Sequence, residues 1–182
     1  MKLYTIDTGY IDYLKQFQEH IYDNMENNRL RPYAGVVLTV GTHKYYAPLS
    51  SPKAKHQKMT DRLDFIRLEH KGQLIAVINL NNIIPVADEL VTLIDIPNLA
   101  DIRYQNLLNV EMIDIRRKQA TITKNANSVY NKVTKFGDEP RNARLVSICY
   151  DFLLLEQKLL EFLAIKTSTT PQSTSVPATP AP

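Results

Sequence analysis

The pattern of apolar residues, glycine and proline changes near residue 100, and this change limits the fold more than any other feature. Before it, short alternating segments are separated by turn residues. Residues 2–7 are typical of a strand, and two hairpins turn at residues 41–42 and 71–72. After it, residues 101–136 contain no Gly or Pro, and apolar side chains recur at helical spacing. Strands followed by helices predict the α+β class, a mostly antiparallel sheet with helices inserted and appended.

Other segments complete the predicted order of elements. Residues 8–22 predict a helix that begins after an N-cap at Asp7 or Thr8, and residues 141–166 predict a last helix. The Asn-rich residues 24–32 indicate a loop. Further strands are expected at residues 83–86 and 90–95; Pro85 favours the edge of the sheet for the first of them.

The length and the two ends of the chain predict one domain. The 182 residues are enough for a sizeable core, which we expect over residues 1–166. Residues 167–182 have no charged or aromatic side chain and contain four prolines, so we expect a disordered tail. A single cysteine, no signal peptide and no apolar run of about 20 residues predict a cytoplasmic protein without a membrane segment.

The positive charge is concentrated in one segment. The chain has 22 Lys and Arg against 19 Asp and Glu, yet residues 27–60 contain no acidic residue. The six basic residues of that segment are Arg29, Arg31, Lys44, Lys53, Lys55 and Lys58. Such a segment favours a polyanionic partner. A solvated basic face without a partner explains the charge alone equally well.

The loop "YYAPLSSPKAKH", residues 45–56, carries the strongest chemical signal. Nearby sequence offers no phosphate loop, no metal-ligand spacing, no paired carboxylates and no acid for a serine hydrolase. It offers hydroxyls beside cations. RNA is cleaved without a metal when its 2′-hydroxyl attacks the adjacent phosphate and fixed cations stabilise the developing charge. Ser51, Lys53 and Arg31, with a nearby His or Tyr, supply these groups. A proline-bounded turn with solvated lysines is the simpler interpretation.

Several residues are candidates for contacts with RNA. Tyr10, Tyr33, Tyr45 and Tyr46 are candidates for stacking on bases, although strand alternation places one of the last two in the core. His56 is a candidate for proton exchange near neutral pH. Arg29, Lys44, Lys55 and Lys58 are candidates for phosphate contacts.

The motif "YYAPLSSPK", with the opening "MKLYTIDTGYIDYLK" and the strand "YAGVVL", resembles the toxins of type III toxin–antitoxin systems, the ToxN/AbiQ family. The resemblance covers the chain to about residue 166. The usual family motif has Thr where this chain has Ser50, which keeps the hydroxyl. Carried over by position, Ser51 is the catalytic serine, with Ser50 and Lys53 in the same motif. The family often has a basic residue shortly before the strand that begins here at Tyr33, and Arg31 matches it less closely.

The resemblance implies a compact, strongly curved antiparallel sheet related to the MazF/Kid-like toxins. It implies a metal-independent endoribonuclease without cofactor, which leaves 2′,3′-cyclic phosphate and 5′-hydroxyl ends. It also implies a repeated pseudoknot RNA antitoxin that the toxin processes and binds, in cyclic toxin–RNA assemblies. Two other interpretations stay open on the residues alone, a non-catalytic RNA-binding module and a protein-interaction domain.

Overall fold

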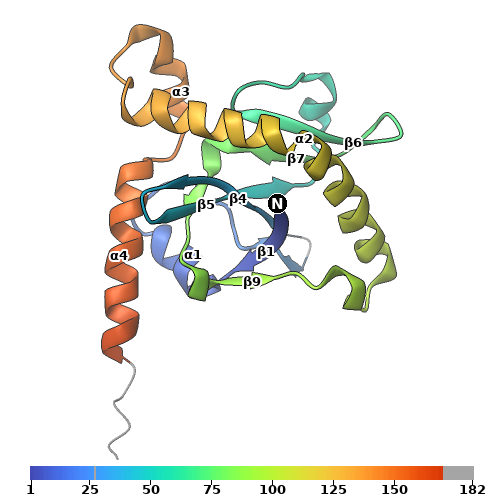
Figure 1. Ribbon diagram of the computed structural model, residues 1–182, viewed down its shortest axis with the longest axis horizontal. Coiled ribbons are helices and arrows are strands. Elements are labelled where there is room, and N and C mark those ends of the chain that lie inside the picture. Colours follow the sequence, from blue (N-terminus) through green and yellow to red (C-terminus); the bar gives the residue numbers. More distant parts are fainter. Residues whose placement is uncertain (27, 170–182) are drawn as a thin grey trace, which may run out of the picture.

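The computed structural model describes residues 1–26 and 28–169, which fold around one seven-stranded sheet (Figure 1). Its strand order is β6-β7-β5-β4-β1-β9, with β8 paired to β5, and each pairing of neighbouring strands is antiparallel. The strands of this sheet are β1 (Lys2–Ile6), β4 (Tyr33–Val40), β5 (His43–Ser50), β6 (Phe65–His70), β7 (Gln73–Asn79), β8 (Ile84–Pro85) and β9 (Val91–Leu93). The mixed α and β architecture with a mostly antiparallel sheet confirms the predicted class.

Strand β5 lies at the centre of this sheet. Its first half pairs with β8, its second half pairs with β7, and β4 runs beside it along nearly its whole length. The last two residues, Leu49 and Ser50, lie opposite Ile78 and Val77 of β7. The end of β5 is therefore held in the sheet up to Ser50, and the chain leaves the sheet immediately after it.

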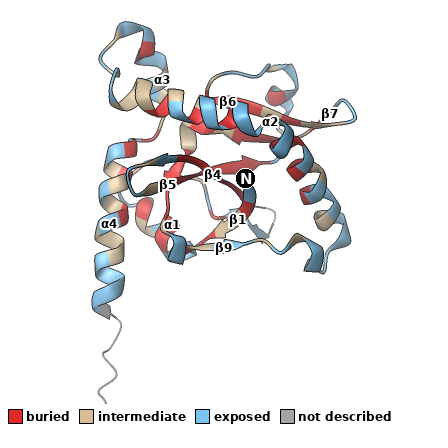
Figure 2. Ribbon diagram, viewed as in Figure 1, coloured by how far each residue is buried: buried red, intermediate tan, exposed pale blue. Residues whose placement is uncertain are grey.

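Helix α2 (Ile102–Thr134) is the longest element and packs against β6, β4 and β7. It begins where the sequence indicates, because the Asp101 side chain accepts a hydrogen bond of 3.0 Å from the Tyr104 backbone N–H. Figure 2 shows the buried residues gathered on the strands and on the sheet side of α2. The buried residues of α2 also include two with carboxyl groups, Glu111 and Asp114.

Helices α1 (Thr8–Leu14) and α4 (Phe152–Thr169) pack against each other beside the sheet (Figure 1). Asp7 caps α1, since its side chain accepts a hydrogen bond of 2.9 Å from the Tyr10 backbone N–H. The predicted helix over residues 8–22 is wrong in length, because α1 ends at Leu14 and the chain then turns.

The predicted single helix over residues 141–166 is two helices, α3 (Ala143–Ile148) and α4. The interruption is made by Asn81, whose side-chain amide donates to the Ile148 carbonyl at 2.9 Å. The Asn81 carbonyl in turn accepts a bond of 3.1 Å from the Tyr150 backbone N–H. Tyr150 is buried beside this break. The bonds to Asn81 divide the helix, and the apolar stripe in the sequence does not reveal them.

Two more predictions need correction. The Asn-rich loop contains a small hairpin of β2 (Met25–Glu26) and β3 (Arg29–Leu30). The predicted tail began at residue 167, whereas α4 runs to Thr169; the remainder of that prediction, residues 170–182, lies outside the described residues. Short 3-10 turns connect the other elements. Within the described ranges, no helix is long and apolar enough to cross a membrane.

Candidate active site

The two serines of the loop motif lie at the end of β5 in different environments. Ser50 is buried, while Ser51 is exposed and is the first residue beyond the strand. Pro52 follows, and the chain then enters a 3-10 turn over Ala54–Lys58. The end of a paired strand thus positions the Ser51 backbone and leaves its hydroxyl open to a ligand.

His56 shapes the loop that carries Lys53. Its Nδ1 accepts a hydrogen bond of 3.1 Å from the Lys53 backbone N–H, and its own backbone N–H donates to the Lys53 carbonyl at 2.8 Å. The ring is buried and lies 5.4 Å from the Phe65 ring. Burial, followed by the charges of Lys55 and Lys53, lowers the pKa of His56. These effects favour the neutral imidazole, and its contacts hold the Lys53 backbone in place.

Arg31 fastens the end of β5 to the segment that precedes β4. Its Nη1 donates to the Leu49 carbonyl at 2.9 Å, to Ser50 Oγ at 3.1 Å and to Glu26 Oε2 at 3.1 Å. Its Nε donates to the Asp23 carbonyl at 3.0 Å. The Arg31 side chain is only 8% exposed. These contacts hold the Arg31 guanidinium against Ser50 and fix the end of β5. The catalytic role of Arg31 that the sequence suggested stays a prediction.

A hollow of about 330 Å³ opens beside Ser50, and we call it the basic hollow. It is lined by amide groups at the end of β7 and after it, by the Tyr22 ring, and by the carboxylates of Glu26 and Asp64. The amide groups belong to Asn79, Asn81 and Asn82. Its basic side chains are Arg31, Lys53, Lys55, Arg62 and Arg144. Arg62 and Arg144 are exposed. A hollow with this composition suits a phosphate-bearing chain with polar bases.

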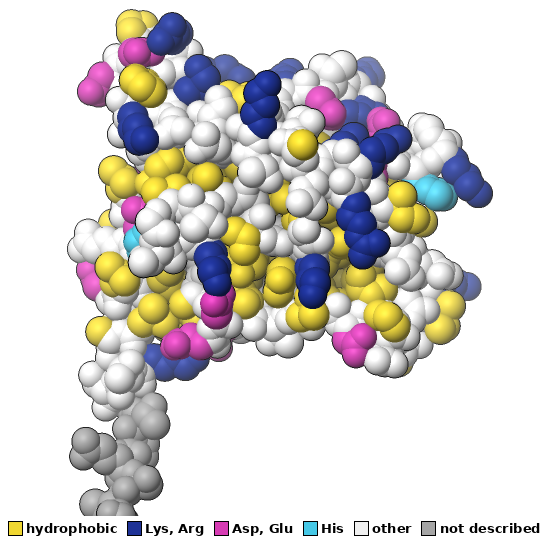
Figure 3. Space-filling model, in the orientation of Figure 1, with side chains coloured by type: hydrophobic (Ala, Val, Ile, Leu, Met, Phe, Trp, Pro, Cys, Tyr) yellow, Lys and Arg dark blue, Asp and Glu magenta, His cyan; other side chains and the backbone are white. Residues whose placement is uncertain are grey.

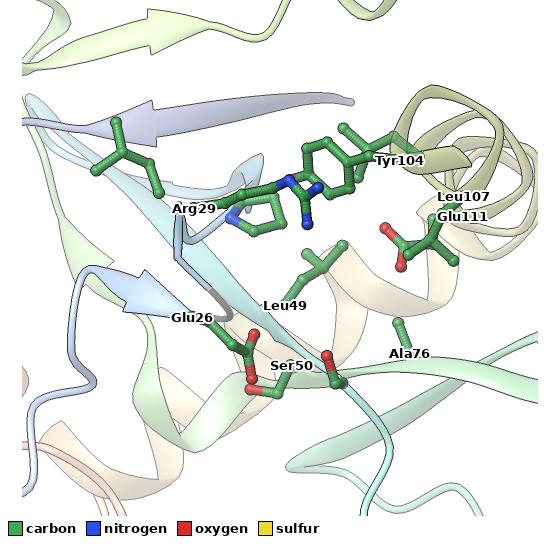
Figure 4. A pocket seen from close by; sticks show the side chains of 12 residues that line it. Glu26, Arg29, Leu49, Ser50, Ala76, Tyr104, Leu107 and Glu111 are labelled. Atoms are coloured by element: carbon green, nitrogen blue, oxygen red, sulfur yellow. The ribbon is translucent and has the colours of Figure 1, made fainter. Parts of the chain in front are cut away.

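A second, smaller pocket lies beside the two serines, between β2, β3, β5 and α2 (Figure 4). We call it the carboxyl pocket, because Glu26 and Glu111 are among its lining residues. Ser50 and Ser51 line it together with Arg29, Tyr104 and several apolar side chains. Figure 4 shows the Glu111 carboxyl pointing into the space between Tyr104 and the serine end of β5.

The presence of two carboxyl groups near the serines corrects a sequence-based expectation. The segment from residue 27 to 60 has no acid, but the fold brings Glu26 and Glu111 to Ser50 and Ser51. Burial, and then the charge of Glu26, raise the pKa of Glu111 to about 8. Among residues 1–26 and 28–169, no group of three His, Cys, Asp or Glu side chains has the arrangement of a metal site.

The tyrosines expected to stack on bases are core residues. Tyr10 has no exposed surface and donates a hydrogen bond of 2.8 Å to the Pro85 carbonyl, while Tyr33 is 2% exposed. Tyr45 and Tyr46 are both buried, so the prediction of one core ring is also wrong. Tyr45 donates to Glu156 at 2.6 Å, which satisfies its hydroxyl and allows its ring to be buried as well.

The remaining predicted basic residues have separate locations. Lys44 is at the far end of β5, where it pairs with Asp88 at 2.6 Å, and Lys58 is exposed outside both pockets. Arg29 lines the carboxyl pocket, pairs with Asp101, and lies 4.8 Å from the centre of the Tyr104 ring. Of the predicted set, the basic hollow therefore gathers only Arg31, Ser50, Lys53, Lys55 and His56.

Sequence reasoning missed the lining residues that come from distant segments. Arg62 stands just past the acid-free segment, and the Asn-rich run at residues 79–82 is visible in the sequence. Neither Arg144 nor Glu111 has a local signal, because each appears as an ordinary residue of a helix. They are brought to the site only by the way α3 and α2 pack.

A sequence model for the toxin ToxN of type III toxin–antitoxin systems matches residues 2–160. The chain belongs to the ToxN family. Curated relatives agree. The endoribonuclease ToxN of Pectobacterium atrosepticum is 31% identical over 89% of this chain and 94% of its own length. The endoribonuclease ToxN of Bacillus thuringiensis subsp. kurstaki is 30% identical over 88% of this chain and 84% of its own.

The endoribonuclease AbiQ of Lactococcus lactis subsp. lactis is also similar, at 27% identity over 87% of both chains. The serine motif, the opening and the strand "YAGVVL" together suggest a very close match to AbiQ, but this identity is lower than that of the two ToxN proteins. AbiQ is therefore a family relative at moderate distance.

Solved structures show the same fold. One, from work on selective inhibition of a type III toxin by a non-coding RNA pseudoknot, has a TM-score of 0.80 and 30% identity. It matches 89% of this chain and 97% of its own. Another, from work on a processed non-coding RNA that regulates a bacterial antiviral system, has a TM-score of 0.77 and 29% identity, with 89% and 99% covered.

Proposed function

We propose that this protein is a metal-independent endoribonuclease, the toxin of a type III toxin–antitoxin system that acts in antiviral abortive infection. The observation that carries the proposal is the position of the serine motif, with Ser51 exposed at the end of β5, where the basic hollow and the carboxyl pocket meet at Ser50. Membership of the ToxN family and the endoribonuclease relatives support it. Because its substrate and its inhibitor are both RNA, we place its action in the cytoplasm.

The proposed reaction is attack by a 2′-hydroxyl of the RNA on the adjacent phosphate. The attacking 2′-hydroxyl loses its proton, the bond to the 5′-oxygen of the next nucleotide breaks, and that oxygen takes up a proton. The products therefore carry a 2′,3′-cyclic phosphate and a 5′-hydroxyl. Ser51 hydrogen-bonds the reacting phosphate and Lys53 stabilises its added negative charge, which is usually the largest catalytic effect. Arg31 acts through Ser50, whose hydroxyl it holds at 3.1 Å. Arg62, Lys55 and Arg144 hold neighbouring phosphates.

The proposed regulator is a repeated pseudoknot RNA antitoxin that the toxin both processes and binds. A relative's structure was solved in work on selective toxin inhibition by a non-coding RNA pseudoknot. A cut antitoxin inhibits if its end stays in the basic hollow, since it then occupies the position of the substrate. Cyclic toxin–RNA assemblies and a relation of the sheet to MazF/Kid-like toxins remain part of this proposal.

The direct test is cleavage of total bacterial RNA by the purified protein in excess EDTA, with the product ends mapped. The proposal predicts internal cleavage that is unchanged by EDTA and leaves cyclic phosphate and 5′-hydroxyl ends. Cleavage that stops in EDTA and returns with added Mg²⁺ would contradict the metal-free reaction. RNA binding without any cleavage would indicate a non-catalytic RNA-binding module instead.

A further inference from the structure

The carboxyl pocket has the composition of a small ligand site. Leu30, Pro32, Leu49 and Leu107 and the Tyr104 ring provide apolar walls, while the serines and two carboxyl groups supply the polar atoms. Aromatic and apolar walls with a few converging polar groups are typical of sites that bind a flat ring. The pocket shares Ser50 and Glu26 with the basic hollow, so a ligand can occupy both.

Glu111 is the unusual residue of this pocket. It is 5% exposed, and its Oε2 has no hydrogen-bond partner; among residues 1–26 and 28–169 only Asn24 Oδ1 shares this property. Asp114, three residues further on the same helix, is also buried but accepts a bond of 2.7 Å from the Glu69 backbone N–H and pairs with Lys118 at 3.3 Å. Buried polar groups are normally satisfied, so a carboxyl at the wall of this pocket with a buried, unpartnered oxygen indicates a missing partner.

We propose that the carboxyl pocket holds one nucleobase of the bound RNA, next to the cleaved bond, with Tyr104 and the leucines against its face and Glu111 hydrogen-bonded to its edge. This inference rests on the proposed function, because it assigns a base-binding site to the same cleavage reaction. The nucleotide's phosphate then lies at Ser51, which lines the pocket.

The chemistry of Glu111 suits the edge of a base. Because burial favours the neutral form at pH 7, the carboxyl carries one donor and one acceptor, as an amide does. Each nucleobase presents a neighbouring donor and acceptor on its Watson–Crick edge, and single-stranded RNA leaves that edge free. An apolar partner would leave the Glu111 carboxyl without a hydrogen bond in the pocket, whereas a base provides one.

The test uses a synthetic RNA with one mapped cleavage site and copies in which single nucleotides around that site lack the base. Wild type is compared with Glu111→Met, which keeps the volume and removes the hydrogen bonds, and with Glu111→Gln, which keeps a donor and an acceptor. Leu107→Trp adds bulk to the pocket from a side chain that is 39% exposed, so the fold is expected to tolerate it. Values of kcat/KM are measured for every pair of protein and RNA.

At one nucleotide next to the cleaved bond, we expect base removal to lower wild-type kcat/KM about tenfold. Glu111→Gln should keep that loss, while Glu111→Met and Leu107→Trp should reduce it to about twofold, because their pocket no longer holds the base. If wild type cleaves the RNA and base removal has equal effects in all four proteins at every position, the base-binding pocket is excluded. The proposed nuclease activity is then unaffected. Wild type that cleaves no RNA, so that no cleavage site can be mapped, would overturn both.

Discussion

At the residue scale, the site depends on two buried ionisable side chains with different roles. Arg31 is satisfied, since its guanidinium donates to two backbone carbonyls, to Ser50 and to Glu26. Glu111 is unsatisfied, and its neutral form is favoured by burial and by the nearby charge of Glu26. Arg31 therefore stabilises the fold around the serines, whereas Glu111 costs stability that a bound base recovers.

Replacing Arg31 should destabilise the whole protein. In Arg31→Met, the Leu49 and Asp23 carbonyls lose a donor and Glu26 loses its ion pair, so we expect the free energy of unfolding to fall by ~3–5 kcal/mol. Arg29→Met is the matched control, because its pair with Asp101 is about half exposed and should contribute under ~1 kcal/mol. Denaturant unfolding measures both. Unchanged stability with lost cleavage would instead assign Arg31 a direct contact with RNA.

Glu111→Gln should change the dependence of stability on pH. The pKa of Glu111 is about 8 in the folded protein and near 4.5 in the unfolded chain, so only the folded state holds the proton between these values. The contribution of this group to the free energy of unfolding is fully present below about pH 4.5. It is lost as pH rises to about 8, at ~1.4 kcal/mol per pH unit. Glu111→Gln does not titrate, so its Tm advantage over wild type should grow between about pH 5 and 8 and level off above pH 8. A constant difference would contradict this.

At the scale of elements, the local signals in the sequence predicted most of the fold. Glycine-centred turns and alternation identify the two hairpins, and the absence of Gly and Pro identifies α2. The errors occur where a distant contact decides. Asn81 divides the last helix, and two adjacent tyrosines on β5 are both buried by other elements. Such contacts have no signature in the segment that they change.

The β4–β5 hairpin depends on a close approach between Gly35 and Tyr46. A Cβ atom at position 35 would lie 2.2 Å from Cδ1 of the Tyr46 ring, which is 1% exposed and cannot swing away. Gly35→Ala should therefore lower the free energy of unfolding by ~1–3 kcal/mol. Adding Tyr46→Leu should recover part of that loss, measured by denaturant unfolding of the double variant. Fully additive losses would show that the two residues do not conflict.

At the scale of the whole molecule, the site is assembled from parts of the chain that are far apart. Ser50, Ser51 and Lys53 could be identified from the sequence because they are nearly contiguous, and the charge excess lies in the same segment. Arg62, Arg144 and Glu111 come from other elements and could not be found without the packing. On the face in Figure 3, Lys and Arg side chains are scattered among apolar, uncharged and acidic ones.

The basic hollow should determine how RNA binding depends on salt. Removing one cation that binds a phosphate should reduce the slope of log affinity against log salt by about 0.7 for a single strand. We expect that reduction for Lys55→Ala, Arg62→Ala and Arg144→Ala, measured with an uncleavable RNA. Lys44→Ala is the matched control, because Lys44 pairs with Asp88 away from the hollow. Equal slopes for all four variants would place the RNA elsewhere.

The most direct measurement is RNA cleavage and RNA affinity of Ser51→Ala beside wild type, in the same buffer. Ser51 is exposed and lies at the edge of the carboxyl pocket, so removal of its hydroxyl should leave the Tm within about 1 °C. We predict that cleavage falls at least about a hundredfold while the Kd for RNA changes less than about threefold. A Ser51→Ala protein that cleaves RNA at the wild-type rate would contradict the assignment of this serine as the catalytic residue.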